Sequence, residues 1–129
     1  MKRTVLTIFL PIVCFSVWLS CDNYEFPPSQ YPKVATLPVK TSQSGIIFQG
    51  ELSHLGNRPL INHGFIFALN ESLSQSEQIE LGPLAVTGMF ESVVTSGLLP
   101  NTTYFVKAFV STDSYDAYGE LFSFKTPPQ

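Results

Sequence analysis

Hydrophobic and polar positions alternate along much of this chain, and the alternation is clearest after residue 97. Six residues spaced two apart share one side of an extended chain there: Leu98, Pro100, Thr102, Tyr104, Val106 and Ala108. A side-chain period of two is the signature of a β-strand. A second extended run, 118–126, follows a polar loop and ends before two prolines. The pattern predicts a terminal β-hairpin joined by residues 111–117.

Shorter alternating runs precede this hairpin, at 45–52, 61–69 and 90–95, with weaker extended stretches at 34–39 and 79–86. No stretch keeps a helical period. About six or seven strands with regularly spaced turns predict an all-β antiparallel sandwich. The residues expected to face inward are Ile46, Phe48, Leu52, Phe65, Phe67, Phe90, Val94, Leu98, Tyr104, Val106, Ala108, Val110, Phe122 and Phe124.

Tyr104 stands where the chain enters its longest strand. A tyrosine there can bury its ring and return its hydroxyl to an upstream backbone group, which is the tyrosine corner of Greek-key sandwiches. The spacing of Leu98, Pro100, Thr102, Tyr104 and Val106 resembles the end of a fibronectin type III domain. The endings 117–120 (AYGE) and 124–126 (FKT) resemble the variant common in Bacteroidetes envelope proteins. Two departures from the family are Ala108, where valine is usual, and Phe48, which takes the place of a core tryptophan.

The resemblance covers roughly residues 34–127. It implies a fibronectin type III-like, immunoglobulin-like antiparallel sandwich of about seven strands. It implies little about function, because this fold hosts many unrelated roles.

The first 20 residues read as an export signal. Lys2 and Arg3 precede an apolar stretch, 5–19, that is too short and interrupted for a transmembrane helix. Ser20 and Cys21 fit the cleavage box of bacterial lipoproteins, although Trp18 and Leu19 depart from it. We therefore expect a signal peptide at 1–20, a lipidated, extended, proline-rich tether at 21–33 and the sandwich at 34–127. Lipidation at Cys21 predicts an outer-membrane lipoprotein of the cell envelope, facing the periplasm or the surface. The alternative is that Cys14 and Cys21 are apolar residues of an uncleaved anchor helix.

The charge balance argues against nucleic-acid binding. The whole chain has 7 Lys and Arg against 10 Asp and Glu, and removing Lys2 and Arg3 leaves 5 against 10, a net charge of −5. The remaining cations are scattered, so no basic patch can neutralise phosphates.

Catalytic chemistry has little support in the sequence. The two histidines, His54 and His63, have neither a nearby cysteine nor a metal-ligand spacing, and no nucleophile elbow or phosphate-binding glycine loop occurs. Asp113, Asp116 and Glu120 are close enough in sequence for a calcium site, but they lack the calcium-loop pattern and also suit a solvated loop. We expect no enzyme activity, no cofactor and no metal.

Two surfaces are candidates for binding. The loop 111–118 offers Asp113, Tyr115, Asp116 and Tyr118, which are residue types that binding loops on sandwiches use. We expect this loop at the same end of the sandwich as the tether, and the alternative is an ordinary loop whose tyrosines fold back on the sheet. The second candidate is an exposed face carrying Phe105 and Phe109, either covered by the aromatic residues of 24–31 or open to a partner.

These features predict a non-enzymatic envelope lipoprotein. Its membrane contact is the lipid anchor at Cys21, and its sandwich binds a protein or a glycan. The alternative is a structural accessory subunit of a larger outer-membrane complex, for glycan uptake or fimbriae.

Overall fold

The computed structural model describes residues 29–128, and these form nine β-strands and no helix. The predicted all-β class is confirmed. The strands are β1 (Lys33–Thr36), β2 (Lys40–Ser42), β3 (Gly45–His54), β4 (Asn62–Ala68), β5 (Glu77–Glu80), β6 (Gly88–Val94), β7 (Thr103–Ser111), β8 (Asp116–Tyr118) and β9 (Phe122–Lys125). A search of the described residues finds no helix able to cross a membrane. The predicted signal peptide, the predicted lipidation site Cys21 and the predicted tether up to residue 28 lie outside them.

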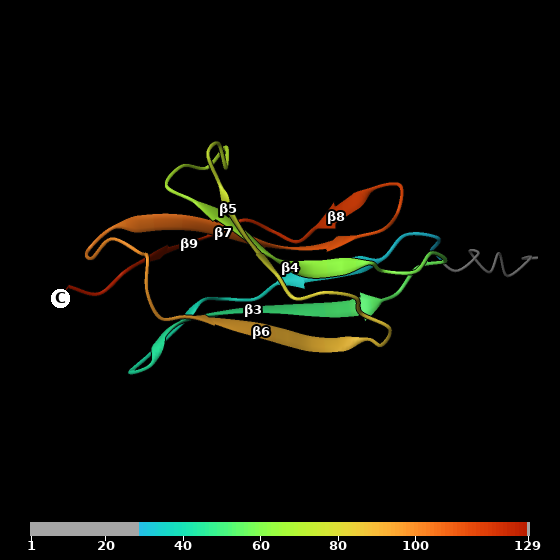
Figure 1. The fold of residues 1–129 in the computed structure, drawn as a ribbon, viewed down its shortest axis with the longest axis horizontal. Helices are drawn as coiled ribbons and strands as arrows, with labels where there is room; N and C mark the ends of the chain where they lie inside the picture. The colour runs from blue at the N-terminus through green and yellow to red at the C-terminus, as the bar shows by residue number, and fades with distance from the viewer. Residues whose placement is uncertain (1–28, 129) are drawn as a thin grey trace, which may run out of the picture.

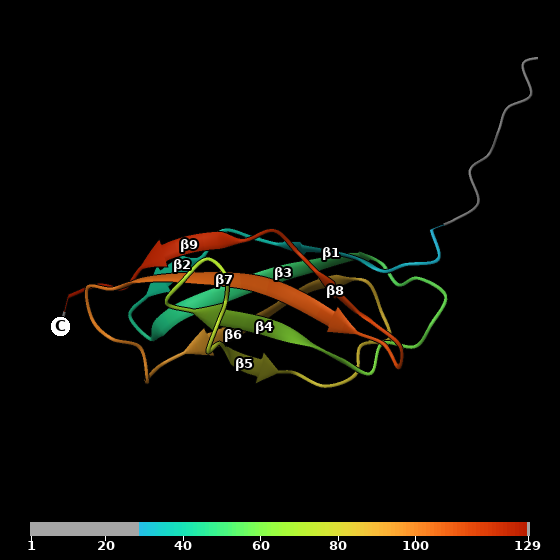
Figure 2. The same ribbon diagram turned by 90° about the horizontal axis from the view of Figure 1, so that it is seen from above.

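The strands form two antiparallel sheets that face each other (Figure 1). In the first sheet, β3 pairs with β6 along one edge and with β1 and then β2 along the other. In the second sheet the order is β5, β4, β7, and the outer edge of β7 pairs with β8 and then with β9. Figure 2 shows from above how β1 and β2 lie along one edge, and β8 and β9 along another.

The nine strands exceed the predicted seven because two edge rows are interrupted. Pro38 lies in the break between β1 and β2, and a proline has no N–H to donate to a ladder. Gly119 lies in the break between β8 and β9.

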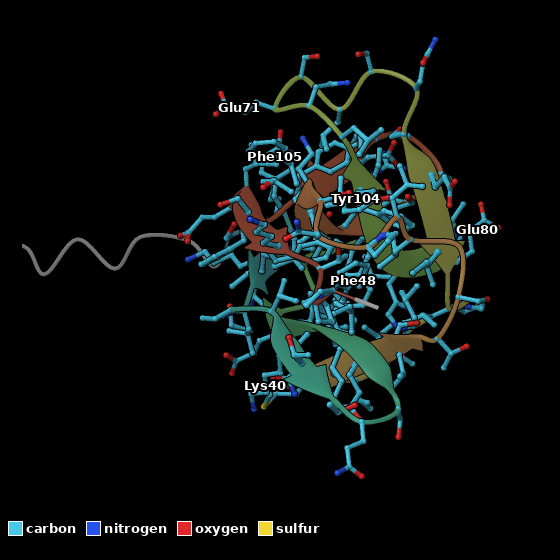
Figure 3. All side chains as sticks on the ribbon, turned by 90° about the vertical axis from the view of Figure 1, so that its left-hand side faces the viewer. Lys40, Phe48, Glu71, Glu80, Tyr104 and Phe105 are labelled. Carbon is cyan, nitrogen blue, oxygen red and sulfur yellow. The ribbon has the colours of Figure 1, made fainter. Side chains whose placement is uncertain are left out.

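Phe48 is the centre of the core. Its buried ring projects from β3 and lies 5.7 Å from the ring of Phe65, 5.4 Å from that of Phe67 and 5.3 Å from that of Phe124, measured between centroids. All three partners belong to the second sheet, so Phe48 joins the two layers (Figure 3). Aromatic pairs of this kind contribute about 0.5–1.5 kcal/mol each beyond the area they bury.

The predicted core is confirmed. Every residue expected to face inward is buried in the main cluster or packs against it. The cluster also includes Leu60, and Leu84 packs against the cluster. These two residues pair with each other in an isolated β-bridge outside the named strands. Neither residue was predicted to face inward, because Leu60 precedes the alternating run 61–69 and Leu84 follows Gly82 and Pro83 in the weak stretch 79–86.

Tyr104 closes one end of β7. Its ring is buried and stacks on Phe124, and its hydroxyl accepts a hydrogen bond from the Leu99 N–H at 2.8 Å. The backbone partner lies five residues upstream, as the tyrosine-corner geometry requires.

A hydrogen bond between Ala108 and Thr36 joins the two layers at the side of the sandwich where β1 meets β8. Ala108 on β7 faces the gap between β8 and β9, and its N–H donates to Oγ1 of Thr36 at 2.9 Å. The Ala108 carbonyl accepts from the Gly119 N–H at 2.9 Å. A Cβ on Gly119 would collide with the backbone N and Oγ1 of Thr36, so a glycine is needed for this approach.

Replacing Thr36 tests the contribution of this junction. Thr36→Val keeps the shape but leaves the Ala108 N–H buried without an acceptor, which should lower the free energy of unfolding by about 1–3 kcal/mol. Thr36→Ser keeps the hydroxyl, so its free energy of unfolding should fall by less than that of Thr36→Val. Urea denaturation of both variants measures the difference, and a valine variant as stable as the serine variant would contradict the proposed role.

Tyr104→Phe tests the hydrogen bond of the corner. The ring stays, but the Leu99 N–H loses its acceptor, so we expect a loss of roughly 1–2 kcal/mol. Val106→Ala, at a fully buried position, should cost as much or more through the cavity it leaves, and exposed Thr103→Ala should be nearly neutral. A larger loss of stability for Thr103→Ala than for Val106→Ala would show that the side of β7 assigned to the core is incorrect.

Candidate functional site

The strands carry their loops to two opposite ends of the sandwich. We call the end formed by residues 29–32, 55–61, 81–87 and 112–115 the proximal end, because the described chain begins there. The distal end consists of 43–44, 69–76, 95–102 and 126–128. Figure 1 shows that the described chain begins and ends at opposite sides of the sandwich, and Figure 3 looks onto the distal end.

The N-terminal segment 29–32 is docked on the proximal end. The ring Nε2 of His54 lies 2.6 Å from the Ser29 carbonyl oxygen, and the Asn57 N–H donates to the Gln30 carbonyl at 3.0 Å. Gly56 has a φ of +75°, and a Cβ there would lie 2.8 Å from the Gln30 oxygen. Residues 29–32, which fall within the tether predicted at 21–33, therefore belong to the folded end.

The loop between β7 and β8 is a tight turn built on Thr112. Its buried Oγ1 accepts from the N–H groups of Ser114 and Tyr115, and it donates to the Tyr115 carbonyl at 3.1 Å. The Thr112 N–H donates to the same carbonyl at 2.8 Å. The four bonds fix the loop, so its side chains project from a defined backbone.

Tyr115 does not point away from the domain. Its ring meets Tyr31 edge-on, with centroids 5.4 Å apart, and its hydroxyl oxygen is buried with no hydrogen-bond partner among the described residues. The loop thus lies beside the N-terminal segment, at the end where we expected it. Tyr115 is therefore neither displayed for a partner nor folded on the sheet, because it packs on Tyr31 of the N-terminal segment.

Asp113 is held at the surface by an ion pair. The Arg58 guanidinium lies 3.0 Å from its carboxylate, and Ser114 donates a hydrogen bond to the same oxygen at 3.1 Å. The Ser114 hydroxyl, and then Arg58, keep the pKa of Asp113 below its usual value. The ion pair between Asp113 and Arg58 therefore persists at pH values above this lowered pKa, and it is lost as the pH falls through the lowered pKa.

Asp116 and Tyr118 interact with each other and with the outer face of the second sheet. The Tyr118 hydroxyl lies 3.4 Å from an Asp116 oxygen, and Nζ of Lys107 lies 4.2 Å from the ring centroid. Partial burial, and then the Asp116 charge, raise the pKa of Tyr118. In the part of the chain that the structure describes, no three acidic or histidine residues form a possible metal site, so the calcium alternative finds no cluster there.

The exposed face predicted for Phe105 and Phe109 needs correction. Phe109 is only 3% exposed, and Phe105 is half-buried. The reason lies on the neighbouring strand, where Gly64 pairs with Phe109. A Cβ on this glycine would lie 3.3 Å from the Phe109 ring, so the missing side chain leaves room for the ring to settle against β4.

The distal end has two hollows that the sequence did not predict. One, of about 310 Å³, is lined by residues of 41–46, 94–100 and 126–128, and the other, of about 230 Å³, by residues of 67–77, 97–99 and Tyr104. They meet at Gly97 and Leu99, which line both. Leu99 is 57% exposed and Leu69 is 55% exposed, so apolar groups stand at the rims. The Thr126 hydroxyl donates to the Leu99 carbonyl at 2.6 Å and fixes this segment.

The comparisons with known proteins bear on the fold alone. No family model matches the chain, and no curated protein matches it. The sensor domain (short form) of the anti-sigma factor RsgI4 of Pseudobacteroides cellulosolvens matches with a TM-score of 0.61 and 15% identity, over 80% of this chain and all of that one. A myokine structure matches with a TM-score of 0.45 and 16% identity, over 77% and 98% of the two chains. A solution structure of the RsgI4 sensor domain matches with a TM-score of 0.44 and 17% identity, over 76% of this chain and 76% of that one. The first likeness supports a β-sandwich.

Proposed function

We propose that this chain is a non-enzymatic interaction module of the bacterial cell envelope. In this proposal a fibronectin type III-type sandwich, held by a lipid on Cys21, binds a protein or glycan partner at its distal end. The observation that carries the proposal is the pair of hollows around Leu99, at the end opposite the docked N-terminal segment. The larger of the two, at about 310 Å³, lies at the lower limit of the size range of small-ligand sites, and exposed apolar side chains at its rim suit a binding contact. A hollow of about 510 Å³ at the proximal end, lined by residues of 55–60 and 83–85, lies beside the docked N-terminal segment.

The type III assignment rests on the strand pairing together with Tyr104. One sheet has three rows (β1 with β2, then β3, then β6), and the other has four (β5, β4, β7, then β8 with β9). The buried tyrosine with its upstream backbone partner supports the resemblance found in residues 98–106. The anti-sigma-factor sensor domain, at 15% identity, supports the sandwich architecture and no particular ligand.

The anchor at Cys21 rests on the leader. A charged start, a short apolar stretch and Ser20 before Cys21 together favour a lipoprotein signal. A lipidated N-terminus carries enough acyl chains for stable membrane attachment. Neither the anchor nor the outer-membrane location depends on the geometry of the sandwich.

The terminal hairpin loop is the weaker candidate for capture. Its best groups are already engaged within the domain, since Asp113 pairs with Arg58, Tyr115 packs on Tyr31 and Lys107 lies over Tyr118. A partner would have to displace these contacts. By contrast, Leu99 and Leu69 are exposed, and burying them on binding costs no existing interaction.

A capture experiment with two matched variants separates the distal end from the hairpin loop. The chain from residue 21 is immobilised and exposed to solubilised envelope proteins and to a panel of purified glycans. Leu99→Ser should weaken the capture of any retained molecule by on the order of tenfold, which corresponds to about 1.4 kcal/mol. Tyr118→Ser, at another exposed position, should retain it.

The reverse result, loss with Tyr118→Ser and retention with Leu99→Ser, would place the site on the hairpin loop. Retention by both variants in a complex of fixed stoichiometry would favour the accessory-subunit alternative. Unaltered denaturation midpoints for the two variants exclude unfolding as the cause of a loss.

A further inference from the structure

We infer that the proximal end of the sandwich rests on the lipid bilayer, with its exposed apolar side chains at the boundary between headgroups and acyl chains. The inference rests on the anchor proposed at Cys21 and goes beyond it, because it assigns an orientation and a lipid-contacting surface to the domain. The surface consists of Tyr31, Ile61, Leu81 and Val86.

The length of chain between the anchor and the domain restricts the orientation. Seven residues, 22–28, separate Cys21 from Ser29, where the docked segment begins. Fully extended, the eight Cα-to-Cα steps from Cys21 to Ser29 span about 29 Å at most. The nine steps of β3 alone span roughly 30 Å, and the loops at both ends add to the length of the sandwich. The chain can therefore bring the proximal end to the bilayer, but it is too short to bring the distal end there.

The proximal end also has the composition of a lipid-contacting surface. Four large apolar or aromatic side chains are exposed in its loops: Tyr31, Ile61, Leu81 and Val86. The distal loops expose only Leu69 and Leu99 among the described residues of this kind. A tyrosine suits the interface because its ring is apolar and its hydroxyl can remain in water.

Charge does not distinguish this end from a side of the sandwich. At the proximal end the carboxylate of Asp113 pairs with Arg58 and Lys33 is exposed nearby, but Glu80 and Asp116, at the strand ends beside these loops, are exposed as well. The outer face of the first sheet likewise carries the exposed carboxylates of Glu51 and Glu91. The orientation therefore rests on the chain length and on the exposed apolar side chains. With the proximal end on the membrane, the distal hollows point away from it.

A single tryptophan can report which end meets the lipid. The only tryptophan of the chain is Trp18, which lies before residue 21, so the chain from Cys21 onward has none. Val86→Trp places the reporter at the proximal end, and Leu99→Trp places it at the distal end. The two sites are comparably exposed, at 68% and 57%. Each variant is coupled through the Cys21 thiol, the only one left, to a maleimide phospholipid in phosphatidylcholine–phosphatidylglycerol vesicles.

Brominated phosphatidylcholine quenches a tryptophan that touches acyl chains. We expect at least a twofold loss of emission, with a blue shift, for Val86→Trp and no loss for Leu99→Trp. Equal quenching of both, or quenching of neither, would overturn the inference. A second pair, Ile61→Ser against Leu69→Ser, in the Val86→Trp chain should reduce the quenching only for the former, because the two residues are 53% and 55% exposed at opposite ends.

The coupling chemistry separates this inference from the proposed anchor. The vesicle experiment supplies the anchor at residue 21 artificially, so its outcome depends only on the domain. The mass of the chain purified from the producing cell reports independently whether Cys21 carries acyl groups. An unmodified Cys21 would refute the anchor, and absent quenching with a modified Cys21 would refute only the orientation.

Discussion

The contact of Phe48 with three aromatic rings of the opposite sheet is the interaction on which this structure most depends. The described residues contain no cysteine, so no disulfide joins the two layers there. The sheets are held by packing, and Phe48 is the one residue of the first sheet that meets Phe65, Phe67 and Phe124 together. Thr36 adds a hydrogen bond between the layers at one side. A small domain without covalent staples needs such dense packing to remain folded.

The packed middle separates two ends, and both have hollows; the proximal one, of about 510 Å³, is lined by residues of 55–60 and 83–85. The proximal end contacts the N-terminal segment 29–32 through hydrogen bonds of His54 and Asn57 and through the ring of Tyr115. The distal end has hollows fixed by Thr126 and exposed leucines at their rims. The strands hold the two ends apart, so the anchor proposed at one end would determine which surface a partner can reach. The proposed function and the proposed orientation therefore depend on the same feature.

Most of the core could be predicted from the sequence, because burial in a sandwich follows a period of two that is written into each strand. Phe109 was predicted on an exposed or tether-covered face, and it is buried for a reason that its own strand does not contain. Its burial depends on Gly64, which becomes its neighbour only through pairing. Leu60 and Leu84 were missed because they lie in loops and pack through an isolated bridge.

The candidate sites were harder to predict than the core. The hairpin loop has the composition of a binding loop, yet Tyr115 is occupied by Tyr31, a contact between residues 84 positions apart (115 minus 31). The distal hollows combine three or more chain segments, none of which has a distinctive local pattern. Sites of this kind arise from tertiary packing, so a sequence read residue by residue contains no signal for them.

The stability of Phe48 variants tests most directly whether this ring cluster holds the sandwich together. Phe48→Ala should lower the free energy of unfolding by about 3–5 kcal/mol, and Phe48→Leu by less. Phe105→Ala, at a half-buried position on the outer face, should lose less than half as much as Phe48→Ala. Urea denaturation of the chain from residue 21 gives these values. A loss at Phe48 no larger than the loss at Phe105 would contradict the account.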